Sequence, residues 1–232
     1  MTKLLIFDWD GTLSDSLSRI AFCMQRAAED CQLQPPTVEE VRNIVGLGLR
    51  EAIAILYPHI EDDGLIERIK EDYSRHFLSN DKVPSPFYPH VMESLERLRE
   101  QGHILTVATG KSRRGLNRVL AEKGLDSFFH GSRCADETRS KPHPQMINEL
   151  LQEFDVQPSQ AIMVGDTEYD LEMAVNAQVP GLGVSYGAHS VERLQKHKPF
   201  AVVDCFSQVE EAIRGHESCS SLRGAAGDAA IS

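Results

Sequence analysis

The chain has 232 residues, which is long for one small domain and short for two full ones, so we expect one core domain that carries an insertion. Its 24 basic and 35 acidic residues give a formal net charge of −11, and no run of Lys or Arg offsets it. This balance argues against nucleic acid as a partner, because binding to a phosphate backbone needs a basic patch. It is compatible with a small anionic substrate if a metal ion and a few local cations reverse the field inside a site.

Five cysteines are scattered along the chain without CxxC pairing, so neither a disulfide framework nor a zinc site is indicated, and we expect reduced thiols. No signal-peptide pattern precedes the first motif, and no apolar stretch approaches the length needed to span a bilayer. The sequence therefore predicts a cytoplasmic protein without a membrane partner. It says nothing about the oligomeric state.

The first predicted strand covers residues 3–7 and leads directly into Asp8-Trp9-Asp10-Gly11-Thr12. Two ionised side chains at the end of a buried strand cost desolvation free energy unless a cation or a substrate compensates for it. We therefore expect an active site at this strand end.

Residues 15–82 contain no convincing strand. Thr37 followed by Glu40 predicts a capping box at the start of one helix. The segment begins directly after the acidic turn and ends at a Pro-rich stretch, so we expect an all-helical cap domain over the strand end, with residues 1–14 and 83–215 forming the core. The helix-like stretches of this segment are residues 17–30, 37–45, 49–57 and 63–78.

Short apolar runs alternate with amphipathic helical patterns in the rest of the core. The further predicted strands are residues 103–108, 161–164, 181–185 and 201–203. The predicted core helices are residues 91–101, 115–123, 145–154 and 170–177. Strands separated by helices of this length imply parallel crossovers, so the expected fold class is α/β with a doubly wound parallel sheet. Residues 216–232 have almost no large apolar side chain and are predicted to be a disordered tail.

Four polar motifs lie at the ends of predicted strands or in the loops that follow, where open α/β sheets bind their ligands. Because these ends meet at one edge of the sheet, we expect the four motifs to converge. They are Asp8 with Asp10, Thr109-Gly110-Lys111, Ser140-Lys141-Pro142, and Gly165-Asp166 through Asp170.

The four motifs, in this order, resemble those of the haloacid dehalogenase-like superfamily of aspartate-nucleophile hydrolases, in the branch with a helical cap between the first and second motifs. The resemblance covers about residues 3–215 and includes DxDGT, a hydroxyl residue before Gly, an isolated Lys before Pro, and GDxxxD. It implies a Rossmann-like core and the hydrolysis of a phosphate monoester. The opening DWDGTLSDS is most similar to that of phosphoglycolate phosphatases, which implies a small phosphorylated metabolite as substrate.

The resemblance also implies roles at the matching positions. Asp8 would be the nucleophile that forms an aspartyl-phosphate. Asp10 would be the general acid that protonates the leaving alkoxide and then the base that activates water. Thr109 and Gly110 would bind the phosphoryl oxygens, and Lys141 would hold both the phosphate and Asp8.

A Mg²⁺ cofactor follows from the same resemblance, with Asp8, Asp166 and the main-chain carbonyl of Asp10 as protein ligands. Asp170 is either a further ligand, an outer partner of the ligands, or a cap of the helix that follows. Two carboxylates about 4 Å apart repel by about 4 kcal/mol at an effective dielectric constant of about 20, so a cation is needed before a phosphate can approach.

The predicted cap contains the loop Val45-Gly46-Leu47-Gly48-Leu49-Arg50. Its glycines allow close approach to the site, and Arg50 is suited to bind a substrate carboxylate. We therefore consider Gly46 and Arg50 candidate substrate-binding residues. The alternative is an ordinary helix-helix turn with a solvated arginine.

Two other functions are compatible with the sequence. A phosphomutase of the β-phosphoglucomutase type shares the motifs and would transfer the phosphoryl group to a second sugar hydroxyl. A non-catalytic binding protein with the same fold would use the cleft without chemistry, although it would have no need to keep Asp8, Asp10, Lys141 and Asp166.

Overall fold

The computed structural model describes residues 2–79 and 83–228. Its centre is a six-stranded sheet in the order β3-β2-β1-β4-β5-β6, and all neighbouring strands are parallel. This confirms the doubly wound α/β fold class. The strands are β1 (Leu4–Phe7), β2 (Ile104–Thr109), β3 (Gly131–Cys134), β4 (Ala161–Gly165), β5 (Gly181–Val184) and β6 (Ala201–Val203).

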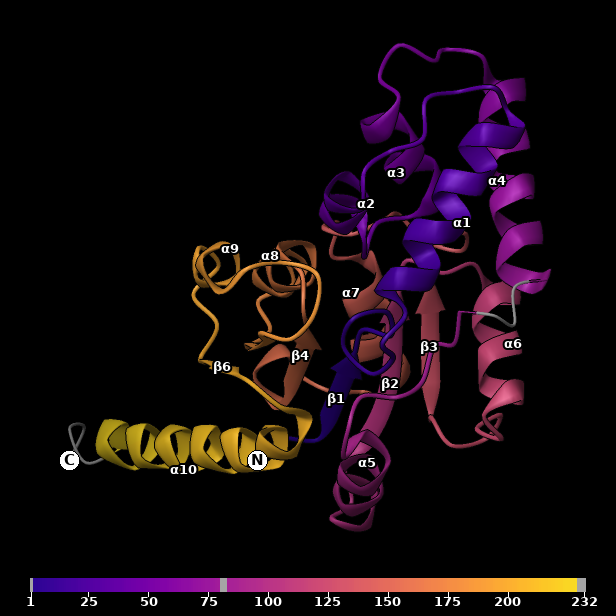
Figure 1. Cartoon of the computed structure of the whole chain (residues 1–232). Coiled ribbons are helices and arrows are strands. Elements are labelled where there is room, and N and C mark those ends of the chain that lie inside the picture. Colours follow the sequence, from indigo (N-terminus) through magenta and orange to yellow (C-terminus); the bar gives the residue numbers. More distant parts are fainter. Residues whose placement is uncertain (1, 80–82, 229–232) are drawn as a thin grey trace.

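Strand β1 lies at the middle of the sheet, and all four of its residues are buried. Its side chains alternate between the two faces, as the two-residue period of a strand requires. Leu5 and Phe7 belong to a core cluster with α5, α6 and α10, whereas Leu4 and Ile6 pack against α7 and α8 on the opposite face. Helices therefore cover both faces of the sheet (Figure 1).

The core helices are α5 (Val91–Glu100), α6 (Arg113–Glu122), α7 (Gln145–Glu153), α8 (Glu168–Asn176), α9 (Val191–Gln195) and α10 (Val209–Asp228). Two short 3-10 turns, Pro158–Gln160 and Phe206–Gln208, precede β4 and α10. Strand β3 was missed in the sequence analysis, because its residues Gly-Ser-Arg-Cys form no apolar run. A strand at the edge of the sheet can be this polar, because three of its four residues are only half-buried.

Four helices lie between β1 and α5, and we call residues 17–79 the helical insert. They are α1 (Leu17–Asp30), α2 (Val38–Ile44), α3 (Leu49–Leu56) and α4 (Asp63–Ser79). The expected capping box is confirmed, because the Thr37 side chain accepts from the Glu40 amide while the Glu40 carboxylate accepts from the Thr37 amide. Figure 1 shows the insert above the ends of β1, β2 and β3 to which the arrows point.

The C-terminal segment differs from its prediction. Disorder was expected from His216 onward, whereas helix α10 continues to Asp228. The helix starts at Val209 within the packed core and continues along the chain past the residues that pack there. The predicted disorder of residues 229–232 lies outside the described residues. No helix in the described part of the chain has the length and apolar character needed to cross a membrane.

The two-sided packing of the sheet predicts how two isoleucines differ. Ile147 on α7 is fully buried, whereas Ile55 on α3 is 55% exposed. We expect Ile147→Ala to lower the free energy of unfolding by about 2–5 kcal/mol, because it leaves a cavity in the core. Ile55→Ala, the matched control, should change it by less than about 0.5 kcal/mol. Denaturant unfolding followed by circular dichroism measures both, and equal losses would contradict the assigned packing.

Candidate active site

The site begins where β1 ends, next to β4, at the point where the chain changes direction across the sheet. The Asp8 amide still donates to the Val164 carbonyl at 3.0 Å, so the backbone of Asp8 is held as a continuation of the strand. The chain then turns through Gly11, whose φ of +87° lies in the left-handed region that favours glycine. The turn brings Asp8 and Asp10 to the same end of the sheet.

Lys141 is the central cation of the site, and its side chain is completely buried. Its ammonium group donates to Asp8 Oδ1 at 2.5 Å and to Asp170 Oδ1 at 2.6 Å. Burial alone would lower the pKa of Lys141, but the carboxylates of Asp170 and Asp8 outweigh burial and raise it above its ordinary value. Lys141 is therefore charged and fixes the position of Asp8.

Asp166 follows β4 and is also fully buried. Its two oxygens accept from the Thr12 hydroxyl and from the Ala188 amide, each at 2.7 Å. Burial and the nearby Asp170 carboxylate raise the pKa of Asp166 to about 7, against the opposing effect of these hydrogen bonds. The fold thus orients this carboxylate but leaves it short of positive charge.

Asp170 has two structural roles at once. Its Oδ2 accepts from the amide and the hydroxyl of Thr167, at 3.1 and 2.7 Å, and forms a capping box at the start of α8. Its Oδ1 accepts from Lys141. Asp170 is therefore the third residue of the helix, whose N-cap is Thr167, and it joins α8 to the charged centre.

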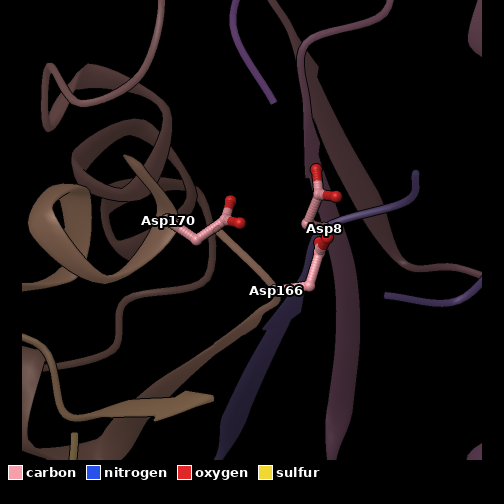
Figure 2. Close-up of side chains that lie close together, drawn as sticks. All are labelled: Asp8, Asp166 and Asp170. Carbon is pink, nitrogen blue, oxygen red and sulfur yellow. The ribbon is translucent and has the colours of Figure 1, made fainter. Parts of the chain in front are cut away.

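The residues present fit a divalent cation. One carboxylate oxygen from each of Asp8, Asp166 and Asp170 lies within 4.8 Å of the others. Figure 2 shows the Asp170 carboxylate extending toward Asp8 and Asp166. Asp8 Oδ2 is buried and has no hydrogen-bond partner among the described residues, which is costly unless a cation binds it. An all-oxygen donor set is the kind that Mg²⁺ prefers.

Charge leads to the same conclusion. Three carboxylates and the Lys141 ammonium leave two formal negative charges in a buried space. Burial raises the pKa of Asp8 well above its usual range, in spite of the opposing Lys141 charge, and the three neighbouring carboxylates add to the effect. One divalent cation would balance the excess negative charge.

Asp10 lies apart from this cluster and has its own partners. Its Oδ1 accepts from the Ser16 hydroxyl at 2.5 Å, and its Oδ2 is 2.9 Å from the Lys111 ammonium group. The sequence analysis gave Lys111 no role in the site. The only signal that could have found it is its place directly after Thr109-Gly110, which brings it to the same edge of the sheet as Asp10.

Thr109 ends β2 beside β1, and Gly110 follows it directly. The buried Thr109 hydroxyl accepts from the Lys111 amide at 3.2 Å, which orients the loop after the strand. A Cβ atom on Gly110 would lie 2.4 Å from the Leu47 carbonyl oxygen and 2.8 Å from that of Gly46. The loop of the helical insert therefore rests directly on Gly110, and only glycine leaves room for it.

Arg50 does not reach the carboxylate cluster. Its guanidinium pairs with Asp63 and, at 3.5 Å, with Glu67, both on α4 of the insert. Arg50 and Gly46 nevertheless line the same cavity as Asp8 and Asp10. This cavity lies between the insert and the core and has a volume of about 510 Å³. The binding of a substrate carboxylate by Arg50 stays a prediction.

Several supporting residues were missed in the sequence analysis. Thr12 is part of the first motif, but its bond to Asp166 spans 154 positions and depends on the tertiary fold. Ser16 and Thr167 are common N-cap residues, so their type alone gave no reason to place them in the site. The Ala188 amide offers no signal at all in a sequence.

Comparisons with known proteins agree on the kind of protein this chain resembles. Residues 5–184 match the family model described as "Haloacid dehalogenase-like hydrolase". The chain is 33% identical over 213 residues to "Probable phosphatase IndB" of Dickeya dadantii (strain 3937), covering 90% of this chain and 92% of the relative. It is 29% identical over 220 residues to "Phosphoglycolate phosphatase" of Vibrio vulnificus (strain YJ016), covering 91% and 96%.

A solved structure gives the same picture. The chain superposes with a TM-score of 0.80 and 28% identity on the crystal structure of "a predicted phosphoglycolate phosphatase" from Haemophilus somnus 129pt, covering 90% of this chain and 97% of that one.

The turn at Gly11 gives the first prediction for the site. A Cβ atom there would lie 2.2 Å from Asp166 Oδ2, whereas Gly102 has the same φ of +87° and nothing within 4 Å of such an atom. Gly102→Ala should lower the free energy of unfolding by about 1–2 kcal/mol through backbone strain alone. Gly11→Ala should cost at least about 1 kcal/mol more, because Asp166 must move. Equal losses in denaturant unfolding would show that Asp166 is not held against the turn.

The cation site predicts a metal-dependent stability. Mg²⁺ at about one hundred times its Kd should raise the free energy of unfolding by about 2.7 kcal/mol. Asp166→Asn should lose most of this gain, whereas Asp126→Asn, which changes an exposed carboxylate, should keep it. Unfolding curves with and without Mg²⁺ measure the effect without reference to activity. Equal gains in the two variants would contradict the assigned ligands.

Proposed function

The chain belongs to the haloacid dehalogenase-like hydrolase family and is a phosphatase of that family, and we propose that it hydrolyses a small phosphate monoester with Mg²⁺ through a phosphorylated Asp8. The observation that carries this proposal is the position of Asp8. One of its oxygens is fixed by Lys141, the other has no hydrogen-bond partner among the described residues, and the carboxylate lies within 4.8 Å of those of Asp166 and Asp170. Phosphoglycolate is the first candidate substrate, because relatives bear that name.

The reaction divides into two displacements. In the first, a carboxylate oxygen of Asp8 forms a bond to phosphorus, the bond between phosphorus and the ester oxygen breaks, and Asp10 gives its proton to the departing alkoxide. In the second, Asp10 takes a proton from water, the water oxygen bonds to phosphorus, and the bond to Asp8 breaks. The products are an alcohol and inorganic phosphate, and Asp8 and Asp10 return to their initial states.

The fold supports these roles by giving the carboxylates of Asp8 and Asp10 different partners. Asp8 is in contact with Lys141, whereas Asp10 is held by Ser16 and Lys111 at the floor of the cavity. The Lys141 ammonium group would hold the phosphoryl oxygens near Asp8, and the Thr109 and Gly110 backbone would add hydrogen-bond donors. Bound Mg²⁺, held by Asp8, Asp166, Asp170 and the Asp10 carbonyl, would supply the positive charge that allows an anionic ester to approach a carboxylate.

The helical insert is proposed to act as the cap of this site. Its loop rests on Gly110, and the Gly48 amide donates to the Ser140 hydroxyl at 2.8 Å, directly before Lys141. The cap would exclude bulk water during the first displacement and would contact the alcohol portion of the ester.

Asp8→Asn tests the mechanism. Loss of the nucleophile should lower the rate of phosphate release by at least about a thousandfold, because the amide cannot displace the alkoxide. The matched control is Asp15→Asn, which changes an exposed carboxylate seven positions later in the same segment and should keep the parental rate. Inorganic phosphate is measured over a panel of phosphorylated acids, sugars and nucleotides, with Mg²⁺ and with EDTA.

Circular dichroism of both variants verifies that the fold is retained. A near-parental rate of phosphate release by Asp8→Asn would contradict the role of Asp8 as nucleophile. A bisphosphate product from a sugar monophosphate would favour the phosphomutase. Absence of phosphate release from every ester by the folded parent with Mg²⁺ would favour the non-catalytic binding protein.

A further inference from the structure

The cavity above Asp8 and Asp10 is larger than a two-carbon ester needs. Its volume is about 510 Å³. Phosphoglycolate has nine non-hydrogen atoms and would occupy at most about 270 Å³, even if each atom took the roughly 30 Å³ of a water molecule in the liquid. The cavity therefore has room for a larger alcohol portion.

The wall of the cavity is largely apolar, and most of it comes from the helical insert. Two aromatic rings lie together on it, with the centroids of Tyr73 and Phe77 separated by 5.9 Å and the planes inclined by 35°. Rings at this spacing offer an edge or a face to a third ring. Apolar side chains that line the cavity are Met24, Ile44, Leu49, Tyr73, Phe77 and Val119.

These rings lie on the leaving-group side of the site. The Lys111 ammonium group is 2.9 Å from Asp10 Oδ2 and 4.7 Å from the centroid of the Phe77 ring. Asp10, as the proposed proton donor, must face the ester oxygen that departs. The alcohol portion of the substrate therefore extends from Asp10 toward Phe77.

The cations of the cavity are poorly placed for a second anionic group. Most of them already have acidic partners: Arg50 pairs with Asp63, Lys70 with Glu67, Lys111 with Asp10, and Arg118 with Glu122. A substrate carboxylate that bound one of these four cations would have to displace its partner, whereas an apolar ring would displace none of these pairs. The Arg19 guanidinium and the Lys111 ammonium group already lie 4.6 and 4.7 Å from the Phe77 ring centroid, so a substrate ring would contact the edge of Phe77. Arg114, the remaining cation of the lining, is exposed and pairs with no carboxylate among the described residues, so it is the exception.

We propose that the preferred substrate is a phosphate monoester whose alcohol portion carries an apolar ring that packs against Tyr73 and Phe77, in place of the two-carbon glycolate. This inference rests on the proposed phosphatase function. The ring would exclude water from the space next to Asp10 and would be bound equally well before and during the chemical step. It would therefore raise kcat/KM mainly by lowering KM.

Two esters with the same leaving group isolate the contribution of the ring. Propyl phosphate and 3-phenylpropyl phosphate both release a primary alkoxide, so they differ only in the phenyl group. We expect kcat/KM for the phenylpropyl ester to exceed that for the propyl ester by at least about tenfold. Phe77→Ala should reduce this ratio to less than about threefold. Phe22→Ala, which removes a ring of helix α1 that does not line the cavity, should leave the ratio unchanged.

The ratio of kcat/KM for the two esters is also insensitive to a side effect of Phe77→Ala. Loss of Phe77 can disturb Lys111 and hence Asp10, but this lowers both rates equally and cancels in the ratio. Phe77→Leu, which retains most of the volume without the ring, provides a second measurement if Phe77→Ala is poorly folded. Calorimetric binding of both esters to Asp8→Asn reports the same preference without turnover.

The outcomes separate this inference from the function on which it rests. Hydrolysis of phosphoglycolate and propyl phosphate at least as efficient as that of the phenylpropyl ester would overturn the ring preference and leave the phosphatase intact. Phosphate release from no ester would overturn the proposed function. In that case, binding of the phenylpropyl ester to Asp8→Asn at least tenfold more tightly than the propyl ester would still support the ring preference.

Discussion

The contact of one buried ammonium group with two buried carboxylates is the interaction on which the rest of the structure depends. Lys141 touches Asp8 and Asp170, and Asp166 adds a third carboxylate within 4.8 Å. Removing one partner from a buried ion pair costs about 3–5 kcal/mol, because the remaining charge has neither water nor a counter-ion. The cluster is therefore stable only if three separate segments, which carry Asp8, Lys141, and Asp166 with Asp170, meet at the same point. This requirement explains why so much of the core is organised around the ends of β1 and β4.

The sheet order meets that requirement. Strands β1 and β4 are neighbours, so the residues that follow them, Asp8 and Asp166, meet at the switch point of the sheet. Asp170 reaches the same point from α8 because its other oxygen caps that helix, which couples the helix start to the charged centre. The excess of negative charge that results is unfavourable for folding alone and favourable for binding a divalent cation. The side chains that would bind the cation are thus the ones on which the stability of this centre depends.

Motif chemistry made the centre of this site predictable, whereas its surroundings depend on contacts that a sequence does not display. The apolar run of β1 and the helical periods of the insert gave those elements nearly at their observed bounds. Strand β3 could not be found, because an edge strand of Gly-Ser-Arg-Cys has no apolar pattern. Lys111 was given no role, since its contacts with Asp10 and Phe77 come from segments about 101 and 34 positions away. For the same reason, the ion pairs of Arg50 within the insert were not foreseen.

The core and the helical insert contribute different parts of the candidate site. The core holds every carboxylate proposed to act on phosphorus, whereas the insert supplies most of the wall that the alcohol portion would contact. The two parts meet through polar bonds, such as Tyr169 to the Asn43 carbonyl at 2.9 Å and Arg42 to the Gly187 carbonyl at 2.8 Å. Changes in the wall can therefore alter substrate choice without moving the charged centre. Lys111 is the exception, because it touches Asp10 in the core and Phe77 in the insert. A ring bound against Phe77 would lie beside the ammonium group that contacts Asp10, the proposed proton donor, so Lys111 adjoins both the wall of the cavity and the proposed site of proton transfer.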